Sequence, residues 1–382
     1  MAGSNTVRVT DIPIPGANAW GQRCLRVLAY GNPDARPKAY LQAALHADEI
    51  PGMLVLNHLC QLLNATQEAI PGEIIILPVA NPLGLSQRVS GKLLGRYALS
   101  GAGNYNRHFP ALATAVGERI ADLLSADAER NIEQIRAVMR EILDEETPLD
   151  ETEWLRHRLL SLAIDADIVL DLHCDSEALL HFYFGTPLWP DAEDLSRQMG
   201  SRVSLLATDS GGFPFDEAVA GPWWALAEQF PQWPIPPACL STTIELRGAR
   251  DVNDQQARVD ATNLFKFLQR RGIIEGDPGV LPEPLCAATP LDAVEMIRAP
   301  LGGVVSQMSP LGTDVKKGDC IATITDPMEV HNPQSRYEIV AQIDGVLFAH
   351  TQSRFVAPGQ VLCKLAGNVS LSSRKPGQLL TD

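Results

Sequence analysis

The stretch DIVLDLHCD at residues 167–175 is an apolar run that ends in polar side chains, among them His173. Two other stretches repeat this pattern, AALHADEIPG at residues 43–52 and STTIELRG at residues 241–248. Each is typical of a strand that ends in side chains of catalytic type. Open α/β sheets present their active-site groups at the carboxyl ends of strands. Together the three stretches predict an α/β sheet with a site at one edge.

Three side chains of these stretches, His46, Glu49 and His173, have the chemistry of a catalytic zinc site. Two imidazoles and one carboxylate suit Zn²⁺ when the fourth position is left open for water. The short His46-x-x-Glu49 spacing lets one turn supply two ligands, and a distant strand supplies the third. We therefore expect one zinc ion per chain. Glu245 remains free to take a proton from a water molecule activated by the metal and to return it to a leaving amine.

These residues resemble the succinylglutamate desuccinylase and aspartoacylase family, distant relatives of the zinc carboxypeptidases. The matching motifs follow the family's order: His46-x-x-Glu49 with Pro51-Gly52, Asn81-Pro82, Asn106-Arg107, Asp171-Leu172-His173 and Thr243-Ile244-Glu245-Leu246. Two positions depart from the pattern. Ala47 follows the first ligand where Gly is usual, and Asn104 stands where Asp is common. Neither position is a metal ligand in the family pattern.

The resemblance implies a mixed sheet with flanking helices, as in zinc carboxypeptidases, and a zinc-dependent deacylase of N-acyl amino acids. It implies that Asn106 and Arg107 bind the substrate, since a guanidinium offers two parallel donors to a carboxylate. A second arginine that stabilises the oxyanion is expected in the loop after Asn81. Arg88 is the arginine nearest in sequence to the position at which family members carry this residue, and Arg96 is the alternative.

Two rival functions remain open. A carboxypeptidase-like peptidase would have an open groove and act on peptides. A non-catalytic binding protein on the same fold would need to have lost a ligand or Glu245, and neither is lost. The acyl group cannot be read from the sequence. A net charge of −15 repels multiply anionic molecules, so we expect a substrate with one carboxylate and a small neutral or cationic remainder.

The chain is expected to divide into a hydrolase domain over 1–272, with a helical insert at about 111–163, a linker over 273–290 and a β module over 291–382. Strands are predicted over 39–45, 73–78, 168–172 and 242–246, and helices over 53–63 and 261–269.

The predicted module contains an internal repeat. Gly303-Val304-Val305 recurs as Gly345-Val346-Leu347, and Lys317-Gly318 recurs as Pro358-Gly359. The repeat resembles the barrel-sandwich fold of biotinyl and lipoyl carrier domains. No lysine stands between Lys317 and Lys364, where a carrier would need one, so a structural, lid or assembly role is expected.

Composition excludes several other classes of protein. The 382 residues are 45% hydrophobic and 20% charged, as is ordinary for a globular protein. The negative charge disfavours nucleic acid and anionic membranes as partners. The 7 cysteines are scattered and form no C-x-x-C pair, which argues against a disulfide framework. The start of the chain does not resemble a secretory signal, so a cytoplasmic protein with a small-molecule substrate is expected. The sequence leaves open whether the chain forms a homo-oligomer.

Overall fold

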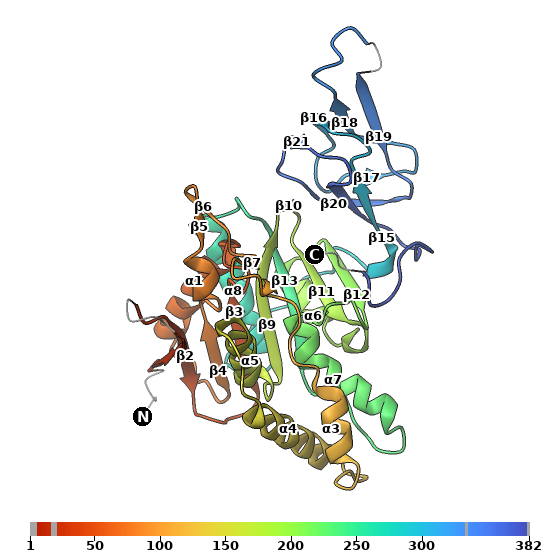
Figure 1. The fold of residues 1–382 in the computed structure, drawn as a ribbon. Helices are drawn as coiled ribbons and strands as arrows, with labels where there is room; N and C mark the ends of the chain where they lie inside the picture. Colours follow the sequence, from red (N-terminus) through yellow and green to blue (C-terminus); the bar gives the residue numbers. More distant parts are fainter. Residues whose placement is uncertain (1–5, 17–20, 333–334, 380–382) are drawn as a thin grey trace.

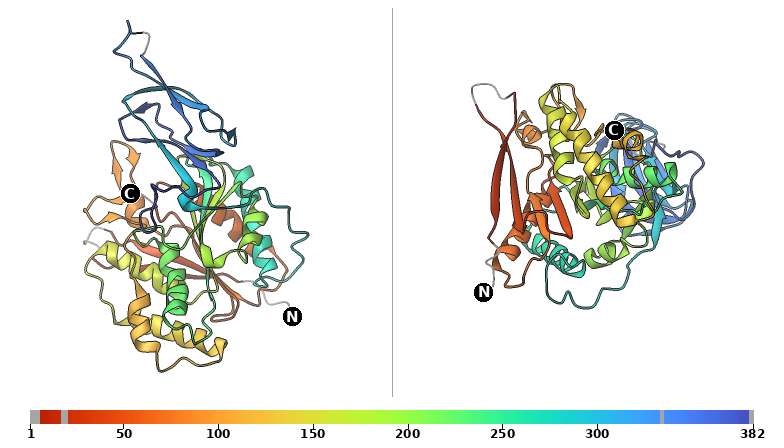
Figure 2. Two further views of the ribbon diagram at one scale, coloured as in Figure 1. Left: turned by 90° about the vertical axis from the view of Figure 1, so that its right-hand side faces the viewer. Right: turned by 90° about the horizontal axis from the view of Figure 1, so that it is seen from below.

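The computed structural model describes residues 6–16, 21–332 and 335–379. A nine-stranded mixed sheet carries helices on both faces, and a separate group of β strands formed by the C-terminal part of the chain stands at one end of it (Figures 1 and 2). The strand order of the large sheet is β1 (Arg8–Pro13), β2 (Cys24–Gly31), β4 (Glu73–Leu77), β3 (Lys38–Ala43), β9 (Ile168–Asp175), β13 (Leu240–Gly248), β11 (His181–Gly185), β12 (Val203–Ala207), β14 (Ala288–Pro290). This architecture confirms the predicted fold class.

The centre of the sheet consists of the parallel strands β4, β3, β9 and β13. Strands β3 and β4 are buried along their whole length and β9 along nearly all of its length, as expected for parallel strands covered on both faces. Successive side chains alternate between the faces, so Tyr40 packs into one core while Ala39 and Leu41 pack into the other. Because these strands are parallel, their carboxyl ends meet at one edge of the sheet.

Helices cover both faces of the sheet. One face carries α1 (Pro51–Ala65), α6 (Glu193–Met199) and α8 (Asp254–Arg270), and the other carries α3 (Leu112–Ile120), α4 (Ala128–Glu145), α5 (Glu151–Ala163) and α7 (Phe215–Gln229). Helices α3, α4 and α5 lie within the predicted insert. Asp127 and Asp150 accept hydrogen bonds from the first amides of α4 and α5, which explains where these two helices begin. Among the residues described, no helix is long and apolar enough to cross a membrane.

Short elements complete the large domain. They are α2 (Pro82–Leu85), the hairpins β5 (Arg88–Val89) with β6 (Lys92–Leu93) and β7 (Tyr97–Ala98) with β8 (Gly103–Asn104), and a 3-10 turn at Thr186–Leu188. The two hairpins follow α2 and lie over the loop that leaves β3. A second 3-10 turn, Leu291–Ala293, precedes the C-terminal strands.

Residues 291–379, called the C-terminal module below, form two antiparallel sheets. Their strands are β15 (Val294–Arg298), β16 (Gly303–Met308), β17 (Asp314–Val315), β18 (Cys320–Thr325), β19 (Arg336–Val340), β20 (Gly345–His350), β21 (Phe355–Val356) and β22 (Val361–Ala366). The motifs at Gly303 and Gly345 begin β16 and β20, and the motifs Lys317-Gly318 and Pro358-Gly359 precede β18 and β22. The first half of the repeat contains β15 to β18, and the second half contains β19 to β22. Each sheet combines strands of both halves, because β15 pairs with β22 and β18 pairs with β19. The repeat seen in the sequence is therefore a pair of interlocked halves.

Two strand pairings tie the C-terminal part of the chain to the large domain, and the amides of Gly377 and Leu379 also donate hydrogen bonds to the carbonyls of Asp209 and Ser210. Strand β14, inside the stretch predicted as a linker, pairs with β12 in the large sheet, which offers an open edge there. Strand β10 (Glu177–Ala178), which follows β9, pairs with β20 of the module. An apolar cluster that includes Leu205 and Phe348 fills the space between them. The module therefore packs directly against the strand ends of the large sheet.

Candidate active site

The loop after β3 carries the first two predicted ligands. Ala44 lies in the left-handed region with φ of 61°, a strained conformation that turns the chain sharply before His46. The Asn81 side chain donates a hydrogen bond of 2.9 Å to the carbonyl of Leu45 and caps α2 by accepting one of 2.8 Å from Gly84. The Asn81-Pro82 motif thus holds the backbone next to His46.

The Pro51-Gly52 motif begins α1 directly after Glu49. A Cβ at Gly52 would lie 2.9 Å from Cβ of Ala43 and 3.0 Å from Cβ of Leu172, so only glycine lets α1 approach β3 and β9 this closely. Ala47, the departure from the family pattern, is buried, and its amide donates to the carbonyl of Gly95. Ala47 fits because its φ is not positive.

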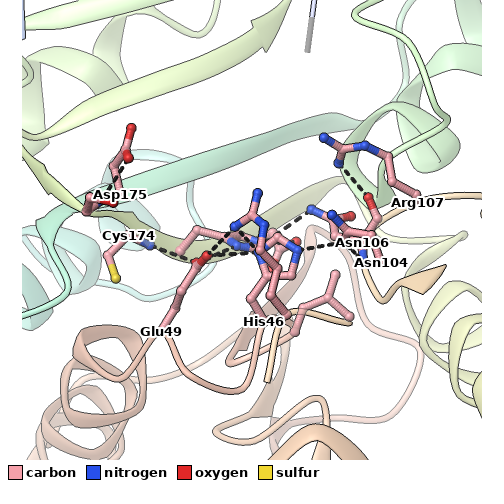
Figure 3. A network of polar contacts seen from close by, with 12 residues as sticks. His46, Glu49, Asn104, Asn106, Arg107, Cys174 and Asp175 are labelled. Atoms are coloured by element: carbon pink, nitrogen blue, oxygen red, sulfur yellow. Dashed lines mark hydrogen bonds and ion pairs between the residues drawn. The ribbon is translucent and has the colours of Figure 1, made fainter. Parts of the chain in front are cut away.

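His46, Glu49 and His173 come together at the carboxyl ends of β3 and β9, and their ligand atoms lie within 4.8 Å of one another. Figure 3 shows His46 and Glu49 side by side. Oε1 of Glu49 lies 2.9 Å from Nδ1 of His46, and Oε2 lies 2.8 Å from Nδ1 of His173. All three side chains are buried. Burial raises the pKa of Glu49, but the two imidazoles outweigh it and hold that pKa well below its usual value.

The outer nitrogens of the imidazoles set their orientation. Nε2 of His46 lies 2.8 Å from Oδ1 of Asn104, and Nε2 of His173 lies 2.9 Å from Oδ2 of Asp171. Both partners are acceptors, so with a metal at the Nδ1 atoms each Nε2 would carry the proton and each Nδ1 would present its lone pair. The two lone pairs and the Glu49 carboxylate converge, which is the donor set of a divalent metal site.

Asp171 rather than Asp175 orients His173. Asp171 shares the face of β9 with His173 because the two residues are two positions apart on a strand. Asp175 instead forms an ion pair with Lys364 of the C-terminal module. Cys174 contributes its backbone amide, which donates a hydrogen bond of 3.0 Å to Glu49.

Glu245 of β13 lines the same pocket. Its Oε2 is buried and has no hydrogen-bond partner within the part of the chain that the structure describes. Burial and, secondarily, the negative charge of Glu49 raise the pKa of Glu245 to about 8. A buried carboxyl group with an unpaired oxygen is available to exchange a proton with a bound molecule.

The two candidate arginines differ in position. Nη1 of Arg96 lies 3.0 Å from Oε1 of Glu49 and 3.2 Å from Nδ1 of His46, and Arg96 lines the pocket. Arg88 lies in the β5–β6 hairpin with an exposed side chain and is not among the residues that line the pocket. The structure therefore brings Arg96 to the metal ligands and leaves Arg88 outside.

Asn106 and Arg107 line the pocket. Figure 3 shows the two residues beside each other, on the same side of His46. Oδ1 of Asn106 accepts a hydrogen bond of 2.8 Å from the amide of Phe215, which begins α7. Arg107 donates to the carbonyl of Asn106 at 2.7 Å, and a Cβ at Gly212 would lie 2.6 Å from its Cδ. Glycine at 212 thus makes room for the guanidinium stem.

Residues that sequence reasoning did not assign to the site also line the pocket. They include Asp216 and Glu217 of α7, Tyr183 of β11, and Val294, Met296, Phe348, Lys364 and Arg374 of the C-terminal module. Nothing in the local sequence around Lys364 marks it, because its place in the site depends on how the C-terminal module docks. Asn104 was noted as a departure from the family motif, and its contact with His46 was not foreseen.

A mixed α/β sheet with a His-Glu-His metal site and a buried carboxylate at its strand ends defines a metal-dependent hydrolase. Residues 35–271 match the catalytic domain of the succinylglutamate desuccinylase/aspartoacylase family. The chain therefore belongs to this family of zinc-dependent amidohydrolases, which act as deacylases, and the predicted family and enzyme class are confirmed.

Individual relatives agree with this assignment. The chain is 24% identical over 360 residues to the N-alpha-acetyl-L-2,4-diaminobutyric acid deacetylase of Halomonas elongata, covering 91% of this chain and 87% of that protein. A crystal structure of a family protein from Shewanella amazonensis superimposes with a TM-score of 0.83 at 26% identity, covering 94% and 98% of the two chains. A second, from Shewanella frigidimarina, gives 0.84 at 25% identity, covering 95% and 97%.

Proposed function

We propose that this protein uses one zinc ion per chain to hydrolyse the amide bond of an N-acetyl amino acid whose side chain is small and cationic, such as N-acetyl-2,4-diaminobutyrate. The observation that carries the proposal is a single pocket lined by His46 and His173 of the metal triad (His46, Glu49 and His173), by Glu245 and Arg107, and by a second set of carboxyl groups. The name of the Halomonas relative supports the same substrate class.

The donor set of two Nδ1 lone pairs and one carboxylate suits zinc. Zinc bound by these three residues would supply Lewis-acid activation of a water molecule and of the amide carbonyl. Glu245, with its unpaired buried oxygen, accepts the proton of that water and delivers it to the departing amine. The raised pKa of Glu245 supports this role, because a proton carrier works best when its pKa lies near the working pH.

Arg96 is the better candidate for the arginine that stabilises the oxyanion. Its guanidinium lies beside both His46 and Glu49, whereas Arg88 is exposed on a hairpin. A cation adjacent to the metal ligands stabilises negative charge that develops on the carbonyl oxygen. Asn106 and Arg107 then anchor the free carboxylate of the substrate.

Two further carboxyl groups that line the pocket, those of Asp216 and Glu217, support recognition of a cation. Glu217 accepts a hydrogen bond of 2.9 Å from the amide of Ser210, and no ion pair joins Asp216 or Glu217 to a basic side chain of the described residues. Burial, with the charge of Asp171, raises the pKa of Asp216 to about 6. Burial, with the charge of Asp216, raises the pKa of Glu217 to about 7. An ammonium group of the substrate would supply the missing positive partner.

A hydrolysis assay with the zinc-loaded protein tests the proposal. The panel is N-acetyl-2,4-diaminobutyrate, its neutral counterpart N-acetylnorvaline, the dianions N-acetylaspartate and N-succinylglutamate, and a short peptide with a free carboxyl terminus. We expect the highest kcat/KM for the diaminobutyrate derivative. Preference for the dianions would refute the substrate class, and preference for the peptide would establish the peptidase alternative.

A further inference from the structure

The pocket extends to both sides of the metal triad. In Figure 3 Arg107 lies on one side of His46 and Glu49, and Asp175 lies on the other. A substrate whose carboxylate meets Arg107 and whose amide carbonyl lies at the triad must direct its acyl group away from Arg107. The acyl group therefore points toward Asp175. This orientation rests on the proposed function.

The acyl end of the pocket contains a cross-domain ion pair. Lys364, on β22 of the C-terminal module, contacts Oδ2 of Asp175 at the end of β9. The side chains are 21% and 17% exposed, so water solvates the pair poorly. Both residues line the pocket. With Lys364 paired in this way, its positive charge is cancelled at the place where the acyl group would end.

Part of the wall at this end is apolar and comes from the C-terminal module. Val294, Met296 and Phe348 form it, and Phe348 is fully buried, while Tyr183 of β11 and Arg374 also line the pocket. The pairing of β10 with β20 holds this wall beside the end of β9, the strand that carries His173. A short uncharged acyl group fits the apolar part of this wall, whereas the carboxylate of a longer acyl group would lie beside a lysine whose charge Asp175 cancels.

We propose that the Asp175–Lys364 pair determines acyl specificity. By cancelling the charge of Lys364, Asp175 makes the site select a short neutral acyl group such as acetyl and reject succinyl. The C-terminal module thus acts as a specificity element of the hydrolase, since it supplies Lys364 and the apolar wall.

The test compares N-acetyl- and N-succinyl-2,4-diaminobutyrate with the zinc-loaded full chain, and the readout is the ratio of their kcat/KM values. Asp175→Asn leaves Lys364 unpaired, and we expect the succinyl-to-acetyl ratio to rise by about tenfold. Lys364→Met leaves Asp175 unpaired, and the ratio should fall by a similar factor. The double variant restores neutrality and should return the ratio close to that of the wild type. Lys364→Arg, which keeps the charge, should not change it.

Product binding gives a readout that does not depend on turnover. Calorimetry should show tighter binding of succinate in Asp175→Asn and weaker binding in Lys364→Met, with acetate affected little. Metal content measured in each variant separates a change in charge from loss of the metal site. Single variants that leave both the ratio and succinate affinity unchanged would overturn the inference. If the wild type hydrolyses neither substrate, the proposed function fails, and succinate binding still decides the role of the pair.

Discussion

Glu245 and His173 are paired residues on the adjacent parallel strands β13 and β9. Paired residues on neighbouring strands project from the same face of a sheet, so the proposed proton carrier stands beside a metal ligand without any loop to position it. In the same register, Thr243 of β13 is paired with Asp171 of β9, the residue that orients His173. One hydrogen-bonded ladder thus positions a ligand, the residue that orients it and the carboxylate that we propose acts on the substrate.

Replacing Glu245 by Gln should abolish most turnover while the metal remains bound. The amide cannot accept the proton of the attacking water, and groups of this kind typically contribute about 10²- to 10⁴-fold. The measurements are kcat and metal content. Glu338→Gln, on the exposed surface of β19, is the matched control and should behave as the wild type. A near-normal kcat for Glu245→Gln would move the proton carrier elsewhere.

Zinc affinity should depend on His46 and on Asn104, the residue that contacts its Nε2. His46→Ala removes a ligand and should lose stoichiometric zinc. Asn104→Ala removes the acceptor at Nε2 and should weaken zinc binding by about 10- to 100-fold, as is typical for residues that orient a ligand. Asn104→Asp keeps the acceptor and should bind zinc at least as tightly as the wild type. His331→Ala, at an exposed position, is the control and should bind zinc as the wild type does. Equal zinc content in all of these variants would refute the proposed metal site.

Arg96→Met and Arg88→Met form a matched pair of variants. Loss of a donor that stabilises the oxyanion typically costs about 10²- to 10³-fold in kcat, so Arg96→Met should show a loss of this size. Arg88→Met should have little effect, because its side chain is exposed outside the pocket. Steady-state kinetics on one N-acetyl substrate decides between them, and the reverse ranking would restore Arg88 to the catalytic role.

The preference for a cationic side chain should increase with pH. The pKa values of Asp216 and Glu217 are raised to about 6 and about 7, so both groups are largely neutral below these values and anionic above them. The ratio of kcat/KM for N-acetyl-2,4-diaminobutyrate to that for N-acetylnorvaline should therefore rise between about pH 5.5 and 8. Taking the ratio removes effects of pH that the two substrates share. Glu217→Gln should flatten the profile, and a ratio independent of pH in the wild type would exclude these groups.

Docking of the C-terminal module should depend on Phe348. Its ring is fully buried, and its centroid lies 5.0 Å from that of His181 on β11. Truncation of a buried Phe to Ala typically costs about 3–5 kcal/mol, so Phe348→Ala should lower Tm clearly. Phe355→Ala is the control, since Phe355 is 67% exposed. Equal Tm values for the two variants would show that Phe348 does not couple the module to the large sheet.

The central part of the fold follows from local sequence patterns. The strands predicted over 39–45, 73–78, 168–172 and 242–246 correspond to β3, β4, β9 and β13. The helix predicted over 261–269 is shorter than α8, which begins at Asp254 because the Asn253 side chain caps it. Apolar runs indicate buried strands. Apolar periodicity also indicates a helix, but it does not include the polar first turn and the capping residue, so the start of α8 could not be placed from it.

The sequence by itself determined the fold class, the family and the grouping of His46, Glu49 and His173, because each depends on short motifs at the ends of apolar strands. Tertiary structure decided which arginine reaches the metal ligands, which acidic residue orients His173, and that Lys364 meets Asp175. These contacts join segments that lie far apart in the chain. Strand register and docking of the C-terminal module create them, and no local spacing encodes either.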